Sequence, residues 1–281
     1  MTIKFIAEIG SNHNCDIVRT LKLIDEAKNI GAWGVKFQLF KAHKLYAPEF
    51  KTQIKKMKKW ELPINFINHI KTQCQINNLK FICTPFDLAA VNFLKDRIDI
   101  FKIGSYELLY IDLIKAVIKT EQPWIMSTGM TMFSQIAEIV EKELNNPPCA
   151  LLACNSNYPA KPENCNLGTI SKLKNYFFRC LIGWSDHTVE PGIIYKAIAL
   201  GAKMIEFHFD LEDGKGFESK IGHCWKPSQI KDVIRNIKIG EMAEQTNNTR
   251  ENEARKWRTD PKDGLRPLKE FREELLKCNT Q

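Results

Sequence analysis

The sequence has no apolar run that approaches the ~20 residues required by a membrane-spanning helix. Its first residues, 1–14, reach acidic and polar side chains too early for a secretory signal peptide. Glycine and proline together amount to 26 of the 281 residues (14 plus 12), too few for a collagenous or low-complexity chain. Because 44% of the residues are hydrophobic and 26% are charged, wholesale disorder is excluded as well. We therefore expect a globular, soluble and cytoplasmic protein without a membrane partner.

The cysteines lack the pattern of a disulfide framework. Nine cysteines are an odd number at irregular spacing, and none belongs to a C-x-x-C pair. In a chain without a secretory signal, such cysteines indicate reduced thiols. The sequence therefore predicts neither disulfides nor a zinc finger.

The positively charged residues are not concentrated in one segment of the sequence. The 41 basic and 33 acidic residues give a net charge of +8, but lysine and arginine are spread along the chain, whereas nucleic-acid-binding proteins concentrate them. The densest cluster, residues 51–59, is interpreted as a solvated helix face or loop. A modest basic excess suits an anionic small-molecule substrate, so we expect no nucleic-acid partner.

Short, nearly continuous apolar runs alternate with amphipathic segments along most of the chain, which is typical of a parallel sheet buried on both faces. Eight strands and about 250 residues predict an α/β fold of the (β/α)8 TIM-barrel type over residues 1–245. An open doubly wound sheet is the competing architecture, but no G-x-G-x-x-G follows the first strand. The predicted strands are 3–10, 34–40, 80–86, 100–105, 123–129, 149–156, 179–186 and 203–210.

Residues 246–281 differ from the rest because they are polar, highly charged and carry only scattered apolar side chains. They predict a short charged C-terminal arm with one helix near residues 267–277. The arm is interpreted either as a partly ordered tail or as a lid or dimer contact.

Each predicted strand carries polar residues at its carboxyl end, where the reactive groups of a TIM barrel gather. This convergence is the strongest argument from the residues alone for an enzyme. Residues two apart on a strand also share a face. The pairs placed together in this way are Lys36 with Gln38, Ser185 with His187, and Glu206 with His208.

Two of these residues are lysines inside the barrel, where an unpaired charge is costly. Lys36 and Lys102 share the barrel's carboxyl end with Ser105, Ser127 and Ser185. Ammonium groups among hydroxyl donors suit a ligand that bears phosphate and carboxylate groups. The other interpretation is that an internal acidic residue neutralises each lysine.

Two histidines, His187 and His208, follow neighbouring strands and form a candidate metal site. Neutral imidazole suits several divalent ions, and a site with two histidines leaves positions open for water and substrate. The alternative is that each ring is a satisfied core residue. His13 and His223 are weaker candidates.

Eight motifs then make the chain recognisable, and over residues 3–210 it closely resembles the sialic acid synthase family (N-acetylneuraminate synthase and its legionaminic and pseudaminic acid relatives). Any one motif is weak, but their common order is specific. The motifs are AEIGSNHN (7–14), VKFQLFKA (35–42), TPFD (84–87), KIGSYE (102–107), STGM (127–130), C-x-S-x-YP (154–159), GWSDHT (183–188) and IEFHF (205–209).

The resemblance implies a metal-dependent condensation of phosphoenolpyruvate with an N-acetylmannosamine-like aldose, giving a nonulosonic acid and phosphate. It implies a homodimer and a divalent cofactor, most often Mn²⁺, with Mg²⁺ or Co²⁺ as alternatives. The roles carried over by the motifs are catalysis for Glu8, Glu107, His187 and His208, metal binding for the two histidines, phosphoenolpyruvate binding for Lys36, Gln38, Lys102, Ser105, Ser127, Ser156 and Ser185, and sugar contact for Tyr158.

The sequence departs from the family pattern at two places. No antifreeze-like C-terminal domain, which helps bind the acceptor sugar, is expected after residue 281. The loop at 211–227 replaces a Pro-Gly-Pro-Asp segment whose aspartate contacts the sugar, and we assign Glu218 to that role, with Glu212, Asp213 and His223 as alternatives. The acceptor half of the site therefore differs from the family pattern.

Three other functions remain open at this point. The same chemistry on a different, possibly phosphorylated, aldose is the nearest alternative because of the altered loop. A catalytically inactive sugar-binding paralogue is the second, although retention of the lysines, histidines and glutamates together argues against it. A metallohydrolase is disfavoured because two anion-binding lysines have no task there.

Overall fold

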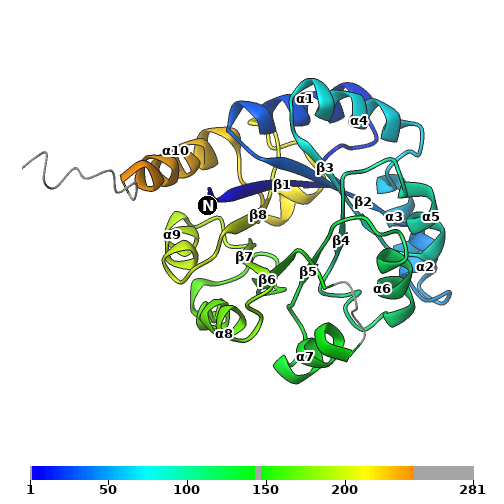
Figure 1. Ribbon diagram of the computed structural model, residues 1–281. Helices are drawn as coiled ribbons and strands as arrows, with labels where there is room; N and C mark the ends of the chain where they lie inside the picture. The colour runs from blue at the N-terminus through cyan, green and yellow to red at the C-terminus, as the bar shows by residue number, and fades with distance from the viewer. Residues whose placement is uncertain (1, 143–146, 244–281) are drawn as a thin grey trace, which may run out of the picture. The chain divides into compact units, whose positions relative to one another are not determined.

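The computed structural model describes residues 2–142 and 147–243 (Figure 1). The predicted arm at 246–281, with its helix near 267–277, lies outside the described residues. The chain divides into a compact unit, Met1–Lys238, and a second unit, Ile239–Gln281, of which residues 239–243 are described.

The predicted fold is confirmed: eight parallel strands close into a barrel in chain order, with helices around it (Figure 1). Every strand falls within a range predicted from the apolar runs, because strands buried on both faces carry that signal locally. The strands are β1 (Lys4–Gly10), β2 (Gly34–Leu39), β3 (Lys80–Pro85), β4 (Ile100–Ile103), β5 (Trp124–Ser127), β6 (Ala150–Cys154), β7 (Leu181–Asp186) and β8 (Met204–His208).

The crossover helices follow the predicted amphipathic segments. The basic cluster forms α3, and its lysines are exposed, as the solvated-face interpretation requires. The helices are α1 (Ile17–Asn29), α2 (Ala42–Leu45), α3 (Lys51–Met57), α4 (Phe66–Ile76), α5 (Leu88–Leu94), α6 (Ile111–Ile118), α7 (Phe133–Lys142), α8 (Gly168–Tyr176), α9 (Pro191–Ala199) and α10 (Pro227–Ala243), with short 3-10 turns η1 (Lys58–Trp60), η2 (Pro162–Asn164) and η3 (Glu218–Ile221).

The barrel interior is apolar at one level and polar at the next. Side chains that point inward from alternating strand positions fill the lower level, so water is excluded there. Two residues further along β1, β3, β4, β5 and β8, the next positions on the same face carry charged or hydroxyl groups: Glu8, Thr84, Lys102, Ser127 and Glu206. The apolar lower level consists of Ile6, Ile82, Ile100, Ile125, Ala150, Leu152 and Met204.

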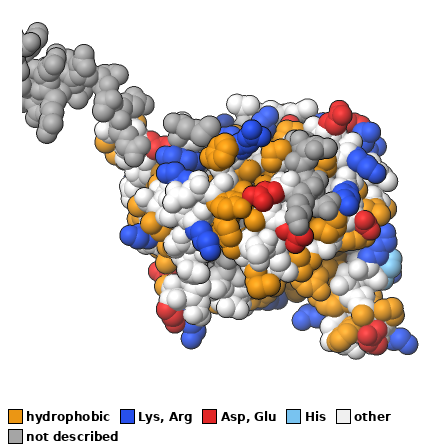
Figure 2. All heavy atoms as spheres, turned by 60° about the horizontal axis from the view of Figure 1, so that its bottom comes forward, with side chains coloured by type: hydrophobic (Ala, Val, Ile, Leu, Met, Phe, Trp, Pro, Cys, Tyr) orange, Lys and Arg blue, Asp and Glu red, His pale blue; other side chains and the backbone are white. Residues whose placement is uncertain are grey.

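The distribution of charge on the surface and the state of the cysteines are as expected from the sequence. On the face shown in Figure 2, basic and acidic side chains are interspersed with apolar ones rather than gathered in one basic patch. The eight cysteines that the structure describes are free thiols. No helix within the described ranges is both long and apolar enough to span a bilayer.

Candidate active site

A cavity of about 370 Å³ opens at the carboxyl ends of the barrel strands. It brings together all the site residues predicted from sequence except Glu8 and Glu218, which lie behind its wall. The predicted residues that line it are Lys36, Gln38, Lys102, Ser105, Glu107, Ser127, Ser156, Tyr158, Ser185, His187 and His208.

Glu206 lies between the two buried lysines. Its Oε1 atom is 3.7 Å from Lys36 Nζ and 3.6 Å from Lys102 Nζ, and it accepts a hydrogen bond of 3.0 Å from Ser185. Burial alone raises the pKa of a carboxyl group, but Lys102 and Lys36 outweigh burial and hold the pKa of Glu206 at about 2. Glu206 thus offsets part of the positive charge of both lysines, and both lysines line the cavity.

Each lysine has a further partner that fixes its direction. Lys36 Nζ lies 2.9 Å from Glu8 Oε2, and Lys102 Nζ donates a 2.7 Å hydrogen bond to Ser127. Burial lowers the pKa of Lys102, whereas for Lys36 the effect of burial is outweighed by Glu206 and Glu8, which raise its pKa. Both side chains are almost wholly buried, so their ammonium groups are preorganised.

Glu8 and Glu107 are the other carboxyl groups at this end of the barrel. Glu8 is fully buried, and burial raises its pKa against the opposing effect of Lys36. Gln38 donates a 2.6 Å hydrogen bond to Glu8 Oε1. Burial raises the pKa of Glu107 to about 7, which allows its carboxyl group to accept or donate a proton near neutral pH.

His187 and His208 face each other across the cavity with ring centroids 5.3 Å apart. His187 Nδ1 bonds the backbone carbonyl of Asn155; because a carbonyl only accepts, the proton sits on Nδ1 and the Nε2 lone pair is free. Burial lowers the pKa of His187 to about 3, so its ring is neutral. His208 Nδ1 lies 2.7 Å from Glu218 Oε2, a bond that outweighs burial and raises the pKa of His208.

Tyr158 and His223 complete the aromatic wall. The Tyr158 ring lies over His187 at a centroid distance of 4.2 Å and contacts His208 at 5.5 Å and His223 at 4.9 Å. Burial lowers the pKa of His223. His13, the other weak metal candidate, is buried outside the cavity lining and accepts a hydrogen bond from the backbone of Cys15.

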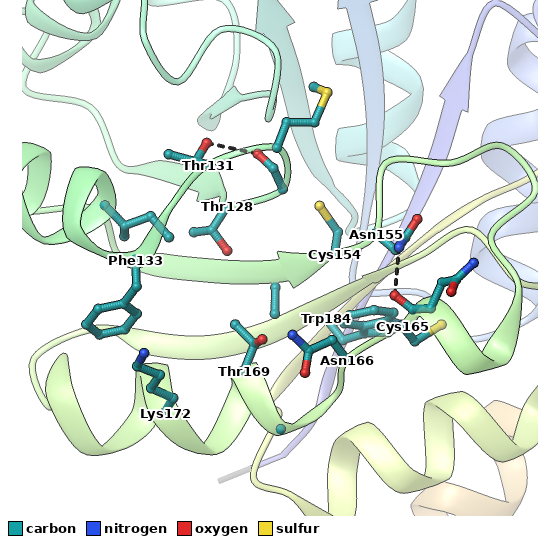
Figure 3. A pocket seen from close by; sticks show the side chains of 16 residues that line it. Thr128, Thr131, Phe133, Cys154, Asn155, Cys165, Asn166, Thr169, Lys172 and Trp184 are labelled. Carbon is teal, nitrogen blue, oxygen red and sulfur yellow. Dashed lines mark hydrogen bonds between the residues drawn. The ribbon is translucent and has the colours of Figure 1, made fainter.

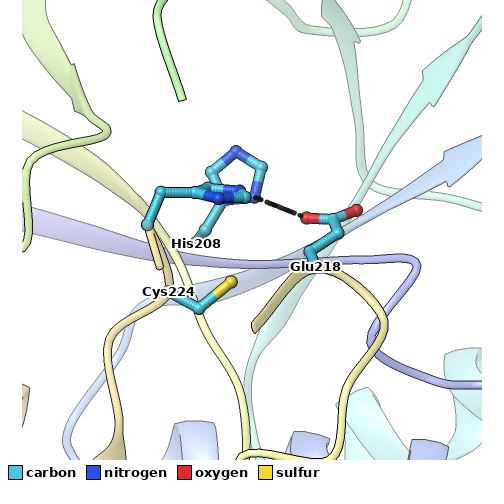
Figure 4. Close-up of side chains that lie close together, drawn as sticks. His208, Glu218 and Cys224 are labelled. Atoms are coloured by element: carbon cyan, nitrogen blue, oxygen red, sulfur yellow. Dashed lines mark hydrogen bonds and ion pairs between the residues drawn. The ribbon is translucent and has the colours of Figure 1, made fainter. Parts of the chain in front are cut away.

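The donor set fits a divalent cation. The imidazole of His187 is held at Nδ1 by an outer partner, as is usual for metal-bound histidine. Four buried carboxyl groups at this end of the barrel offer oxygen atoms or counter-charge to a cation. Carboxyl groups and ring nitrogens lie close enough for this: ligand atoms of His208, Glu218, His223 and Cys224 are all within 4.8 Å of one another (Figure 4). The acidic side chains are Glu8, Glu107, Glu206 and Glu218.

Among the lining residues that were not predicted as site residues, Glu206 and Thr84 carry buried polar atoms that the described residues leave unsatisfied. Glu206 Oε2 and Thr84 Oγ1 are buried without a hydrogen-bond partner, and such atoms in a cavity wall await a ligand or water. Glu206 could have been predicted from the sequence, because it lies two residues before His208 and therefore on the same face of β8. Thr84 lies at the end of β3, opposite Gln38.

Glu218, expected to contact the sugar, does not line the cavity. It is 9% exposed, and both of its carboxylate oxygens are engaged, one by the Ser11 backbone N–H at 2.7 Å and the other by His208. Burial raises the pKa of Glu218, but hydrogen bonds and nearby charge outweigh it, the hydrogen bond to His208 most of all. The pKa of Glu218 therefore lies well below its usual range.

A second cavity, of about 480 Å³, lies beside the barrel at the ends of β5 and β6, next to α7 and α8 (Figure 3). Hydroxyl and amide side chains such as Thr169 and Asn166 line it, and Lys172 is the one charged side chain among the described residues of the lining. The Lys172 ammonium group lies 4.3 Å from the Phe133 ring centroid. None of the described residues that line it carries a carboxyl group or an imidazole, so the smaller cavity is the candidate active site.

Comparison with known proteins points to one family. The chain matches the NeuB family over residues 23–249. It is 36% identical to the uncharacterized protein MJ1065 of Methanocaldococcus jannaschii, over 84% of this chain and 70% of that protein. It is 35% identical to the N,N'-diacetyllegionaminic acid synthase of Campylobacter jejuni, over 74% of this chain and 67% of the synthase.

A solved structure agrees with these matches. The N-acetylneuraminic acid (sialic acid) synthetase of Leptospira borgpetersenii superposes with a TM-score of 0.81 at 29% identity, covering 92% of each chain. The present chain spans about two thirds of the length of the curated relatives. The chain therefore belongs to the NeuB family, and it is an enzyme of the sialic acid and nonulosonic acid synthase type.

Proposed function

We propose that this chain condenses phosphoenolpyruvate with an N-acetylmannosamine-like aldose and water, giving a nonulosonic acid and inorganic phosphate. The observation that carries the proposal is the Lys36–Glu206–Lys102 arrangement next to His187 and His208. It combines fixed positive charge for an anionic donor with imidazoles for a cation in one cavity. The named activities of the relatives support the same general reaction.

The lysines and serines of the cavity are proposed to bind the phosphate and carboxylate of phosphoenolpyruvate. Lys36 and Lys102 supply charge, and Ser127 and Ser185 supply hydroxyl donors close to them. The ionised Glu206 carboxylate opposes the effect of burial on Lys102 and raises the pKa of Lys36, so it favours the protonated form of both groups. Buried and preorganised donors of this kind stabilise developing charge without the cost of reorientation.

A divalent ion, with Mn²⁺ as the first choice and Mg²⁺ or Co²⁺ as alternatives, is proposed to be held by His187 and His208. When bound, it would supply Lewis-acid polarisation of the aldehyde oxygen. The chain's part is to present two imidazoles from adjacent strands, with the Tyr158 ring against both. Tyr158 is 46% exposed, which places it at the mouth, where an acceptor sugar would enter.

Glu107 is proposed to accept the proton of the attacking water. C3 of phosphoenolpyruvate forms the new bond to the aldehyde carbon, water adds to C2, and the C2–O bond to phosphate then breaks as C2 becomes a carbonyl; the two protons of the water end on the former aldehyde oxygen and on the released phosphate. Glu107 lines the cavity with Lys102 and Ser105. A carboxyl group with a pKa of about 7 matches the pH at which such a proton transfer is most efficient.

Phosphate release from phosphoenolpyruvate tests the proposal directly. The measurement uses Mn²⁺ and a panel of 2-acetamido aldoses led by N-acetylmannosamine, with phosphorylated aldoses included. We expect release that requires both the sugar and the metal ion. Bound metal with no release from any sugar would favour a different class of acceptor, and neither metal binding nor release would favour the inactive paralogue.

Activity is expected to fall below about pH 7, because protonated Glu107 cannot accept a proton. About a tenth of Glu107 is ionised one pH unit below that value, and about nine tenths one unit above it. Glu107→Gln is expected to lower kcat about 10²- to 10⁴-fold and to remove this acidic limb. The check is kcat across neutral pH at saturating Mn²⁺, with metal occupancy measured at each pH.

Glu49→Gln is the matched control, because Glu49 is an exposed carboxyl group outside the cavity lining. It should retain both the parent turnover and the parent pH profile. An unchanged acidic limb in Glu107→Gln would assign that limb to another group and refute the role of Glu107.

A further inference from the structure

The loop between β8 and α10 is tied to the end of β1. Asn12 donates a 3.0 Å hydrogen bond to the carbonyl of Phe209 and accepts one of 2.8 Å from the backbone N–H of Glu218. Asn14 accepts a 3.0 Å hydrogen bond from the backbone N–H of Phe217. The side chains of Asn12 and Asn14 thus bind two consecutive backbone N–H groups at the start of η3.

An ion pair anchors the same loop on its other side. Arg19 of α1 pairs with Asp210, whose other carboxylate oxygen accepts hydrogen bonds from the Gly216 N–H at 2.7 Å and the Ser219 hydroxyl at 2.6 Å. Asp210 is fully buried. A buried charge satisfied in this way resists displacement, so the loop that carries Glu218 has one defined position.

Gly10 leaves the space that Glu218 occupies. Its φ is +50°, and a Cβ atom at this residue would lie 2.2 Å from Glu218 Oε1. Only glycine combines this left-handed backbone with so close an approach. Because Gly10 has no side chain, the Glu218 carboxylate can lie against the end of β1 and contact both the Ser11 backbone N–H and His208.

The Glu218 carboxylate lies beside the His208 ring (Figure 4), and Glu218 is not among the residues that line the cavity. One oxygen accepts from Ser11 N–H at 2.7 Å, and the other lies 2.7 Å from His208 Nδ1 and 3.7 Å from His223 Nε2. An ionised carboxylate only accepts hydrogen bonds. The His208 proton that meets it must sit on Nδ1.

We propose that Glu218 is a positioning residue for His208: it fixes the ring proton on Nδ1 and so presents the Nε2 lone pair to the cavity for a divalent transition-metal ion. The inference rests on the proposed role of His208 as a metal ligand. Outer carboxylates that orient a metal-bound histidine affect metal affinity as well as ring direction. This role differs from the sugar contact predicted for Glu218 from the sequence.

The neighbouring cysteine suggests another arrangement, in which an ion sits within the cluster of His208, Glu218, His223 and Cys224. The 2.7 Å between His208 Nδ1 and Glu218 Oε2 is a hydrogen-bond distance. Two ligands of one tetrahedral ion, at about 2.0–2.1 Å from it, lie about 3.3 Å apart. The geometry therefore favours a hydrogen-bonded support for His208 over a four-ligand site.

Glu218→Gln distinguishes these roles by its polarity. The Ser11 backbone N–H only donates, so it retains the amide oxygen, and the amide NH₂ group then faces His208 Nδ1. His208 must move its proton to Nε2, the nitrogen needed for the metal. We expect the Mn²⁺ dissociation constant to rise about 10- to 100-fold, in a protein of nearly unchanged shape.

The experiment combines Mn²⁺ titration with long-range ¹H–¹⁵N NMR of the histidine rings in metal-free, ¹⁵N-labelled full-length protein at alkaline pH. The parent should bind one ion per chain and show His208 protonated on Nδ1, whereas Glu218→Gln should show Nε2. Glu212→Gln is the control, because Glu212 is a carboxylate of the same loop that bonds Ser228 instead. It should match the parent in both measurements.

Unchanged Mn²⁺ affinity and an unchanged His208 tautomer in Glu218→Gln would overturn the inference. If the only change were a higher KM for the sugar, Glu218 would instead be a sugar-binding residue. A second ion per chain that is lost in Cys224→Ser would instead establish the four-ligand site. If the parent protein bound no metal ion, the proposed metal-dependent reaction would be contradicted. The tautomer measurement, made without metal, would still decide the positioning role.

Discussion

Replacing His187 by alanine is expected to abolish Mn²⁺ binding and to lower turnover about 10³-fold, the equivalent of several kcal/mol of lost transition-state stabilisation. The reason is that His187 presents a neutral imidazole whose Nδ1 is already held by the Asn155 carbonyl. The fold should persist, because the ring packs on the half-exposed Tyr158 at the mouth rather than in the apolar level of the barrel. Metal titration, phosphate release and thermal unfolding measure the three effects.

His69→Ala is the matched control. His69 is an exposed residue of α4, and its ring contacts the backbone carbonyl of Asn65, the residue before the same helix. It should leave metal affinity and turnover unchanged. Full turnover of His187→Ala at saturating Mn²⁺ would remove His187 from the metal site.

Lys102→Met is expected to lower kcat/KM for phosphoenolpyruvate about 10²-fold, since a hydrogen bond from a charged group contributes about 1.5–3 kcal/mol. The substitution keeps an unbranched side chain as far as Cε but removes the ammonium group that contacts Ser127 and Glu206. Glu206 would keep Lys36, at 3.7 Å, but lose the ammonium group with the largest effect on its pKa, so its pKa should rise and some stability should be lost. The sugar KM should remain near the parent value.

Lys172→Met is the informative control for this substitution, because Lys172 is the charged residue of the larger cavity. It should leave the phosphoenolpyruvate kinetics unchanged. If Lys172→Met lost the donor affinity and Lys102→Met kept it, the anion site would have to move from the barrel mouth to the cavity beside α8.

The barrel could be predicted because its signals are local. Each strand is a short apolar run, and each crossover helix carries its own apolar stripe, so neither depends on knowing the partner element. The pairs on one face could be predicted for the same reason: side chains alternate along a strand. Lys36 with Gln38 and Ser185 with His187 line one cavity as that alternation requires.

The contacts among these residues were not predictable in the same way. Alternation places Glu206 inside the barrel, but only closure of the sheet puts its carboxylate within reach of both Lys36 and Lys102. The same closure brings Tyr158 against three histidine rings that are separate in sequence. Pairwise distances of this kind depend on strand register and barrel shape, which no short segment encodes.

The sequence by itself determined the order of the strands, the inward positions and the chemical types at the barrel mouth, because periodicity and composition are properties of short segments. Only the tertiary structure decided where Glu218 lies. Its loop has no periodic pattern, and its place follows from hydrogen bonds to Ser11 and Asn12, about two hundred residues earlier in the chain. That is why a residue expected among the sugar contacts lies beside His208: long-range hydrogen bonds, rather than local propensity, position an irregular loop.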